Sequence, residues 1–246
     1  MNYGTKPKMI LFDVGGTLFE DGKCSPLEGL AQLRLLAKNP EATTDERLFQ
    51  LWEEYMDEID VPRKSKSGVG LDIPLCAPLK YAIMHSGLEF DLSTYELEEL
   101  FDRYNSTREF VPGICGLLST LENLGIRAAV ISNNMMSGES LELAVKHWLP
   151  DSKMEFCLTS ADLLFTKPFP RIFTAAVGKA HLAPEDCWYC GDGKVPDVDG
   201  GSSAGLTPVL IDVKMDSDCE MRSDCANGEY MTVNSWSVLA DHLKTL

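Results

Sequence analysis

The sequence lacks long apolar runs and is poor in positive charge. No stretch approaches the roughly 18 consecutive apolar residues of a membrane span, and residues 1–8 include no long apolar region. Neither a membrane span nor a secretory signal peptide is therefore expected. Lys and Arg together number 22 against 38 Asp and Glu, which gives a formal net charge of -16 at pH 7. A chain with this charge repels nucleic acid and anionic membranes, so we expect neither as a partner.

The chain also lacks the second CxxC pair that would complete a four-cysteine zinc site. Cys187 and Cys190 have one CxxC spacing, but they fall in a predicted strand, where positions i and i+3 point to opposite faces. We therefore interpret them as core residues. The eight cysteines are scattered along the chain, which is typical of reduced thiols in a cytoplasmic protein. Cys219 and Cys225 flank a polar stretch and are free to pair, although nothing in the sequence requires a disulfide.

The first apolar segment, residues 9–12, is followed by Asp13 and by the pair Gly15-Gly16. Four consecutive apolar residues predict a short strand buried on both faces, as in a parallel sheet. From Val111 onward, the pattern predicts strands at 127–132, 155–159, 187–191, 207–212 and near 230, with helices at 114–124, 138–148, 170–180, 198–204 and from 235. This alternation predicts an α/β fold, a Rossmann-like parallel sheet core flanked by helices. Residues 213–229 are polar, and we expect a surface loop there.

The segment between the first and second predicted strands has no strand pattern. Leucines at helical spacing and helix-ending signals predict helices at 26–37, 44–59, 77–86 and 94–106. We therefore expect a discontinuous core, residues 1–19 and 108–246, and a smaller all-helical cap domain, residues 20–107. Turn-like sequence at both junctions suggests that the cap moves as a unit. The expected loop 61–70 includes Arg63, Lys64 and Lys66, which are either solvated or directed at a substrate.

Polar residues follow the predicted strands at their C-terminal ends: Asp13 after the first, Ser132 and Asn133 after the second, and Asp192 after the fourth, with Lys167 before that strand and Asp197 beyond it. The C-terminal ends of parallel strands meet at one edge of a sheet, so we expect these side chains in one crevice. Three carboxylates there suit a hard cation such as Mg²⁺, which keeps waters that a phosphate can replace. One lysine would balance the charge of a nucleophile and of phosphoryl oxygens. An Asp before a Gly pair is otherwise an ordinary turn.

These segments resemble the four motifs of the haloacid dehalogenase-like hydrolase superfamily. Asp13-Val14-Gly15-Gly16-Thr17 is similar to the first motif, whose leading Asp is the nucleophile, and Val130-Ile131-Ser132 is similar to the second, whose hydroxyl binds the transferred phosphoryl group. Lys167-Pro168 is similar to the third. Gly191-Asp192 with Asp197 is similar to the fourth, whose acids hold Mg²⁺.

The resemblance covers residues 8 to about 212 and includes the helical cap of the family. It implies a hydrolase in which Asp13 and Lys167 are catalytic. It also implies that Ser132 and Lys167 contact the substrate, and Asn133, directly after Ser132, is close enough to orient it. The implied metal ligands are Asp13, the backbone carbonyl of Gly15, Asp192 and Asp197.

The sequence departs from the family at Gly15. Phosphatases of the family have a second Asp at this position, which protonates the leaving group and later deprotonates the attacking water. Such an acid–base group typically contributes a factor of about 10²–10⁴ to the rate. Glu20 and Asp21, in the predicted turn after the first motif, are candidates to replace it, or are simply polar turn residues.

Three functions remain open. The first is a Mg²⁺-dependent phosphohydrolase that acts on a small phosphorylated or otherwise anionic metabolite through an aspartyl-phosphate. The second is a hydrolase of the dehalogenase or phosphonatase kind, because those members also lack the second Asp. A metal-free dehalogenase has no need of the Asp192 and Asp197 pattern, and no cap lysine matches a Schiff-base motif. The third is a catalytically impaired protein of this fold with a binding or regulatory role. The retained acids favour the first.

Overall fold

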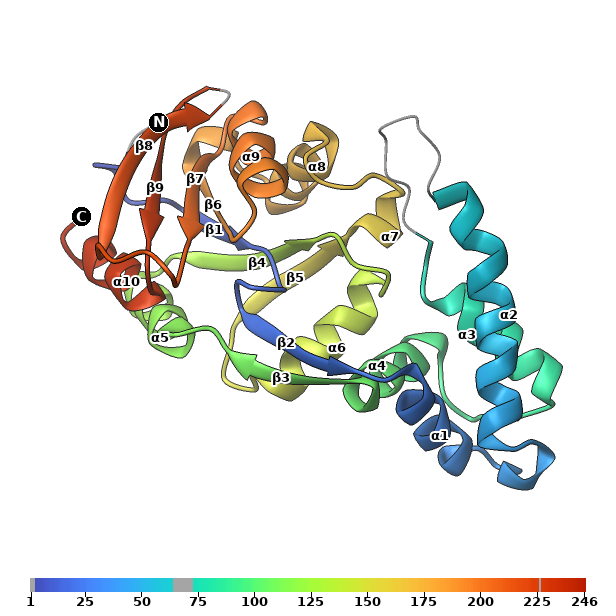
Figure 1. Ribbon diagram of the computed structural model, residues 1–246. Coiled ribbons are helices and arrows are strands. Elements are labelled where there is room, and N and C mark those ends of the chain that lie inside the picture. Colours follow the sequence, from blue (N-terminus) through green and yellow to red (C-terminus); the bar gives the residue numbers. More distant parts are fainter. Residues whose placement is uncertain (1–2, 64–72, 226) are drawn as a thin grey trace.

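A computed structural model describes residues 3–63, 73–225 and 227–246 (Figure 1). Its main sheet has seven strands in the order β5-β4-β1-β6-β7-β9-β8. All neighbouring pairs are parallel except β8 and β9, which are antiparallel. The strands are β1 (Met9–Phe12), β4 (Arg127–Ser132), β5 (Met154–Thr159), β6 (Cys187–Gly191), β7 (Thr207–Ile211), β8 (Cys219–Cys225) and β9 (Gly228–Val233). The predicted α/β fold with a parallel sheet is confirmed.

Strand β1 is buried on both faces, as its uninterrupted apolar sequence predicts. Ile10 and Phe12 belong to one hydrophobic cluster, and Met9 and Leu11 belong to another on the opposite face. The first cluster includes buried residues of helices α5 (Ile114–Leu124), α6 (Gly138–Trp148) and α10 (Trp236–Lys244). The second includes residues of α8 (Pro170–Ala180). Helices therefore cover both faces of the sheet, and only its edges remain for a polar site.

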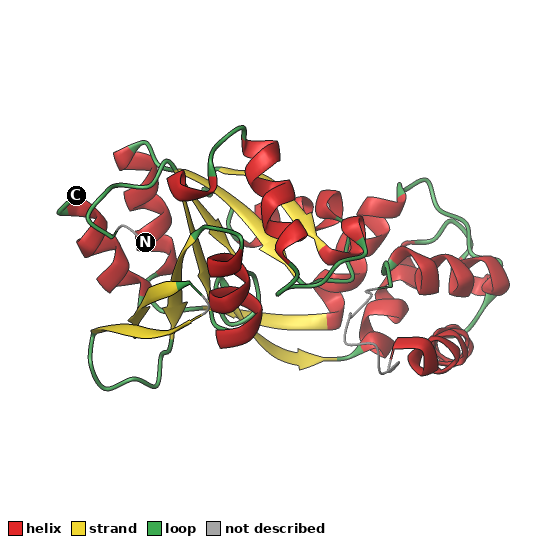
Figure 2. Cartoon of the chain, turned by 90° about the horizontal axis from the view of Figure 1, so that it is seen from above, coloured by secondary structure: helices red, strands yellow, loops and turns green. Residues whose placement is uncertain are grey.

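Four helices precede the second strand of the sheet: α1 (Pro26–Leu36), α2 (Asp45–Arg63), α3 (Cys76–Ser86) and α4 (Thr94–Asn105). We call them the inserted helices. They lie together at one end of the molecule, beyond the sheet (Figures 1 and 2). Trp52 of α2 stacks on Phe101 of α4 with ring centroids 4.9 Å apart. The inserted helices thus have apolar packing of their own, and this packing is continuous with the cluster on one face of the sheet.

The junctions of the inserted helices differ from the prediction. We expected turns near residues 20 and 107, but β2 (Phe19–Cys24) and β3 (Ser106–Phe110) pair as an antiparallel ribbon. Their sequences, FEDGKC and STREF, are mostly polar, so the apolar pattern that marks a half-buried strand is missing. Backbone pairing between the two segments, which no sequence pattern reveals, forms the ribbon.

Parts of two predicted loops are helix or strand instead. Residues 219–225 of the expected surface loop form β8, a largely exposed strand that pairs only with β9. Helix α2 extends through Pro62 to Arg63, so the first three residues of the expected loop 61–70 are helical. Lys64 and Lys66 lie outside the described residues. Within the part of the chain that the structure describes, no helix has both the length and the apolar content to cross a membrane.

The short elements complete the chain. They are the 3₁₀ turns at Pro40–Ala42 and Pro184–Asp186, the π-helical turn at Lys194–Asp199, α7 (Ser160–Leu163) and α9 (Gly200–Ser203). The π-helical turn and α9 correspond to the short helix expected near 198–204. The turn begins soon after the end of β6 and therefore places Asp197 close to that edge of the sheet.

Candidate functional site

Three carboxylates meet at the C-terminal edge of the sheet. Asp13 directly follows β1, and its backbone N–H donates to the carbonyl of Cys190 in β6 (2.9 Å). Asp192 directly follows β6, and Asp197 lies in the π-helical turn after it. One oxygen from each of the three carboxylates lies within 4.8 Å of the others. The structure therefore brings together the three acids that the sequence places at separate strand ends.

Lys167 is buried among these acids, with 4% of the residue exposed. Its Nζ lies 2.9 Å from Asp13 Oδ2 and 2.6 Å from Asp197 Oδ1. It also donates to the hydroxyl of Tyr189 (2.9 Å), which in turn donates to the carbonyl of Ile131 (3.0 Å). Burial raises the pKa of Tyr189 well above its usual value, so the phenol stays neutral. The lysine therefore neutralises part of the acidic cluster and is held from three sides.

Asn133 holds the backbone of Lys167. Its Oδ1 accepts from the Lys167 N–H (2.7 Å), and its Nδ2 donates to the Lys167 carbonyl (3.2 Å). That Asn133 orients a substrate stays a prediction. In the structure both ends of its amide bind the backbone of Lys167. The two residues are 34 positions apart, so no local sequence signal could have revealed this contact.

Ser132 ends β4 and is buried, with 3% exposed. The register that pairs Phe12 with Val130 carries Ser132 one position beyond the level of Asp13 in the neighbouring strand. Its hydroxyl is therefore at the same edge of the sheet as the three acids. This is the placement that the strand-end argument predicts.

The acidic cluster fits a cation. Asp13 Oδ1 is buried and has no hydrogen-bond partner among the described residues, although a buried anionic oxygen needs one. Partial burial, together with the charges of Asp13 and Asp197, raises the pKa of Asp192 from 3.8 to about 6. Burial also raises the pKa of Asp197, and the Lys167 ammonium opposes that shift. A divalent cation would give the free oxygen a partner and relieve the repulsion among the three acids.

The glycines of the first motif differ in what they tolerate. Gly16 has φ 64°, the left-handed region that favours glycine, and a Cβ there would collide with the carboxylate of Asp192. Gly15 is not among the described glycines with positive φ, and it forms an isolated bridge with Phe19. The sequence pointed to Gly15, but the conformational requirement for glycine at position 16 was missed. The only sequence signal for Gly16 was the Gly-Gly pair.

The other predicted residues lie as follows. Glu20 is exposed in β2, opposite Glu109 of β3. Asp21 also belongs to β2, but its side chain is outside the described part, as is that of Arg63. The expectations for Asp21 and Arg63 therefore stay predictions.

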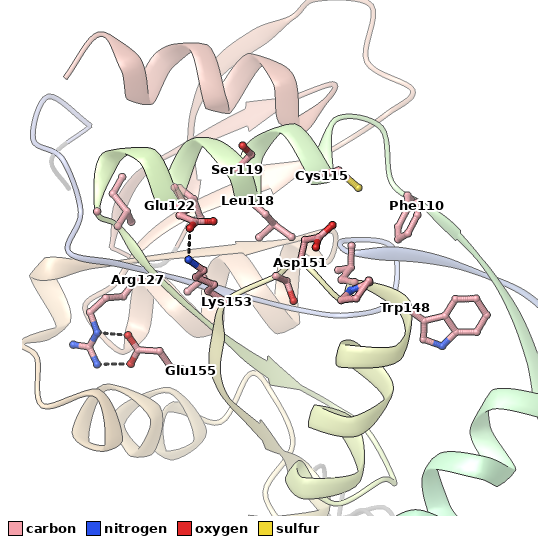
Figure 3. Close-up of a pocket in the computed structure, with 17 residues that line it drawn as sticks. Phe110, Cys115, Leu118, Ser119, Glu122, Arg127, Trp148, Asp151, Lys153 and Glu155 are labelled. Atoms are coloured by element: carbon pink, nitrogen blue, oxygen red, sulfur yellow. Dashed lines mark hydrogen bonds and ion pairs between the residues drawn. The ribbon is translucent and has the colours of Figure 1, made fainter.

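A separate pocket of about 740 Å³ lies between α5, the start of β4 and the loop between α6 and β5 (Figure 3). Four of its five charged lining residues form two ion pairs, Lys153 with Glu122 and Arg127 with Glu155, and the fifth is Asp151. None of the acids of the cluster lines it, nor do Lys167, Ser132 or Asn133. It is therefore not the site that the strand ends form.

Comparisons with known proteins agree with the motifs. Residues 7–205 match the haloacid dehalogenase-like hydrolase family, and the chain belongs to this family. The chain is 29% identical over 137 residues to (S)-2-haloacid dehalogenase 4A from Burkholderia cepacia, and the match covers 53% of this chain and 58% of that enzyme. It is 24% identical over 217 residues to glyceraldehyde 3-phosphate phosphatase from Methanothermobacter thermautotrophicus, with 85% and 87% covered.

A solved structure shows the same fold. The HAD phosphatase from Thermococcus onnurineus has a TM-score of 0.54 with 22% identity, over 96% of this chain and 97% of that one. Hydrolases of this superfamily typically use a metal ion. The relatives include both a phosphatase and a dehalogenase, so family membership alone does not select the reaction.

Proposed function

We propose that the chain is a Mg²⁺-dependent phosphohydrolase that acts on small phosphorylated metabolites through an aspartyl-phosphate on Asp13. The observation that carries the proposal is the cluster of Asp13, Asp192 and Asp197, with carboxylate oxygens within 4.8 Å of one another and Asp13 Oδ1 without a protein partner. An enzyme that displaces halide from carbon without a metal has no use for Asp192. Because Asp192 lies close to Asp13 and Asp197, its charge raises the free energy of the metal-free site. A bound cation best explains why the site has this third acid.

The proposed metal ligands are Asp13, Asp192 and the backbone carbonyl of Gly15. Asp197 has both oxygens engaged already, Oδ1 with Lys167 and Oδ2 with the N–H of Gly193 (2.8 Å). Asp197 would therefore contribute to holding the cation chiefly through its negative charge and its bond to Lys167. When bound, Mg²⁺ supplies positive charge to the phosphoryl oxygens and orients the phosphoryl group.

In the first step, a carboxylate oxygen of Asp13 attacks phosphorus. The bond from that oxygen to phosphorus forms, and the bond from phosphorus to the leaving oxygen breaks. Lys167 holds the nucleophile through Oδ2 and offsets negative charge at the phosphoryl group. The Ser132 hydroxyl donates to a phosphoryl oxygen. Lys167 contacts Asp13 directly, and Ser132 ends β4, the strand next to β1, at the same edge of the sheet.

In the second step, water attacks the phosphorus of the aspartyl-phosphate, inorganic phosphate leaves and the Asp13 carboxylate is regenerated. Gly15 offers no carboxylate to take the proton of the water or to give one to the leaving group. The proposal therefore favours substrates with good leaving groups, such as acyl phosphates, and a slow second step.

A second candidate is a carbon–halogen hydrolase. Two observations favour it: Gly15 in place of an acid, and the 29% identity to a haloacid dehalogenase. In that reaction Asp13 attacks carbon, halide leaves, and water cleaves the resulting ester. Metal dependence separates the two reactions, because only phosphoryl transfer uses the cluster of three acids to hold a cation.

The test is a screen of phosphorylated metabolites with excess Mg²⁺ and with EDTA, with Asp13→Asn as the blank. A parallel arm measures halide release from 2-chloropropionate. Phosphate release that requires both Mg²⁺ and Asp13 supports the proposal. Halide release that persists in EDTA replaces it with the second candidate. Absence of both, with Mg²⁺ still bound, points to a binding or regulatory protein.

A further inference from the structure

Glu98 is a carboxylate buried between the inserted helices and the sheet core. It belongs to α4 and is 1% exposed. Its Oε2 accepts hydrogen bonds from the backbone N–H of Ser137 (3.1 Å), from the Ser137 hydroxyl (2.8 Å) and from the Ser140 hydroxyl. Ser137 is the N-cap residue of α6, so the negative charge lies at the positive end of that helix.

The N-terminus of α6 does not need Glu98 as a cap. Ser137 Oγ already accepts from the N–H of Ser140 (3.3 Å), and Asp162 Oδ1 accepts from the N–H of Gly138 (3.1 Å). Asp162 belongs to the sheet core, in α7. Glu98 comes from the inserted helices, and its Oε1 is buried with no hydrogen-bond partner among the described residues. Burying such an oxygen costs stability, so helix capping alone does not account for Glu98.

The donors of Glu98 belong to residues 132–140, a segment that begins in the catalytic cluster. Ser132 and Asn133 are at one end, and Asn133 holds the backbone of Lys167. The middle of the segment is fixed by its own bonds: Asn134 Oδ1 accepts from the N–H of Met136 (2.8 Å), and Ser160 Oγ accepts from the N–H of Asn134 (2.9 Å). A segment this short and this strongly bonded transmits a displacement from one end to the other.

A second contact from the inserted helices reaches the same segment. The backbone N–H of Leu75, directly before α3, donates to the carbonyl of Met135 (2.7 Å). The inserted helices therefore hold the 132–140 segment at two places, through α4 and through the start of α3.

We propose that Glu98 is a positioning residue that couples the docking of α4 to the placement of Lys167, through the 132–140 segment and Asn133. The proposal rests on the proposed function in that it assigns Lys167 a place beside the nucleophile. In this arrangement the inserted helices also help to set the position of Lys167. Lys167 is set for reaction only when α4 is seated on the N-terminus of α6.

The helix supplies a matched control for Glu98. Glu99, the next residue, is also buried, but it pairs with Arg103 of the same helix (2.7 Å) and, within the described residues, makes no hydrogen bond or ion pair with the 132–140 segment. Glu99→Gln removes one buried negative charge from α4, as Glu98→Gln does, without touching the proposed path.

The experiment measures hydrogen exchange at single amides in wild type, Glu98→Ala, Glu98→Gln and the control Glu99→Gln, without metal or substrate. The informative amide is that of Lys167, which donates to Asn133. We expect it to exchange about tenfold faster in Glu98→Ala, because a buried set of donors has lost its acceptor. Glu98→Gln keeps an acceptor oxygen and should fall between Glu98→Ala and wild type. In Glu99→Gln the Lys167 amide should exchange as in wild type.

Kinetics on acetyl phosphate with Mg²⁺ supply the second readout. We expect Glu98→Ala to lower kcat by about tenfold or more with little change in KM, because a misplaced catalytic group slows the reaction of bound substrate. The proposal is overturned if the Ser137 amide exchanges faster in Glu98→Ala while that of Lys167 is unchanged. It is equally overturned if the exchange rates of amides in β1 increase as much as that of the Lys167 amide, because this result indicates a general loss of stability. If the exchange result holds but no variant turns over any phosphate, the proposed function fails and the coupling stands.

Discussion

The side-chain amide of Asn133 binds the backbone of Lys167 on both sides, with Oδ1 2.7 Å from the Lys167 nitrogen and Nδ2 3.2 Å from its carbonyl oxygen. Asn133 follows the strand that carries Ser132, and Lys167 contacts Asp13 and Asp197. The contact therefore joins the parts of the site that come from β4 to those from β1 and β6. The position of Lys167 therefore depends on the loop after β4.

Asn133→Ala should lower kcat for phosphate release by about tenfold or more while the fold is retained, because Lys167 loses the group that orients it. Asn39 supplies a matched control. It makes the same two-sided contact within the inserted helices, donating to the carbonyl of Gly87 (2.9 Å) and accepting from the N–H of Glu89 (2.8 Å). Asn39→Ala should leave kcat within about twofold of wild type, since it is remote from the strand ends. Equal losses in the two variants would show that Asn133 contributes only stability.

Asp192→Asn should stabilise the metal-free protein and remove its response to Mg²⁺. The pKa of Asp192 is raised from 3.8 to about 6 by partial burial and by Asp13 and Asp197, so the folded state binds its proton more tightly than the unfolded chain does. The charged side chain therefore destabilises the fold, with no effect below about pH 4 and the full effect above about pH 6. In EDTA, the melting temperature of the variant minus that of wild type should grow as the pH rises through this window. Added Mg²⁺ at neutral pH should raise the melting temperature of wild type only.

Gly15→Asp should raise phosphatase turnover, by up to about 10²-fold, because it adds the acid–base group that the site lacks. Gly15 is not among the described glycines with positive φ, so its backbone does not exclude the substitution. Gly16→Ala is the contrasting variant. Its Cβ would collide with the Asp192 carboxylate in a left-handed conformation, and Mg²⁺ binding should be lost. Turnover of p-nitrophenyl phosphate and calorimetric Mg²⁺ titration measure the two effects. A well-folded Gly15→Asp protein with unchanged turnover would show that the acid is not what limits the rate.

Lys167→Met should destabilise the protein by about 3–5 kcal/mol in EDTA, because it leaves buried carboxylates without their cation. The side chains of Lys167 and Asp197 are each 1% exposed, and that of Asp13 is 14% exposed. Urea unfolding measures the loss. The double variant with Asp197→Asn should recover part of it, since one unpaired charge is removed. A single variant as stable as wild type would mean that the ion pairs contribute nothing to the fold.

The strand ends of the site were predictable from the sequence for a physical reason. A strand buried on both faces of a parallel sheet is a run of apolar residues, so the first polar residue after it marks the edge of the sheet. Asp13, Ser132 and Asp192 were each found in this way, and the topology rule for parallel sheets placed them together. Helices with a periodic apolar face, such as 114–124 and 170–180, were predicted to the residue.

The missed features depend on contacts between distant residues. The ribbon of β2 and β3 and the exposed strand β8 are polar, and only backbone pairing with a partner makes them strands. Glu98 looks like any other acid of an amphipathic helix, and its partners are 39 and 42 positions away. Asn133 was selected for its place in the crevice, and its hydrogen bonds to Lys167 in another loop were missed.

The most direct test of the account is to look for the phosphoryl group on Asp13. Wild type is mixed with acetyl phosphate and Mg²⁺, quenched in acid at short times, and digested for mass spectrometry, with EDTA and Asp13→Asn as controls. Because Gly15 cannot activate water, the second step should be the slower one. We therefore expect the peptide containing Asp13 to gain one phosphoryl group, only with Mg²⁺ and only with Asp13 intact, and we expect Gly15→Asp to accumulate less of this modified peptide. Steady phosphate release with no modified Asp13 peptide at any time would contradict the account.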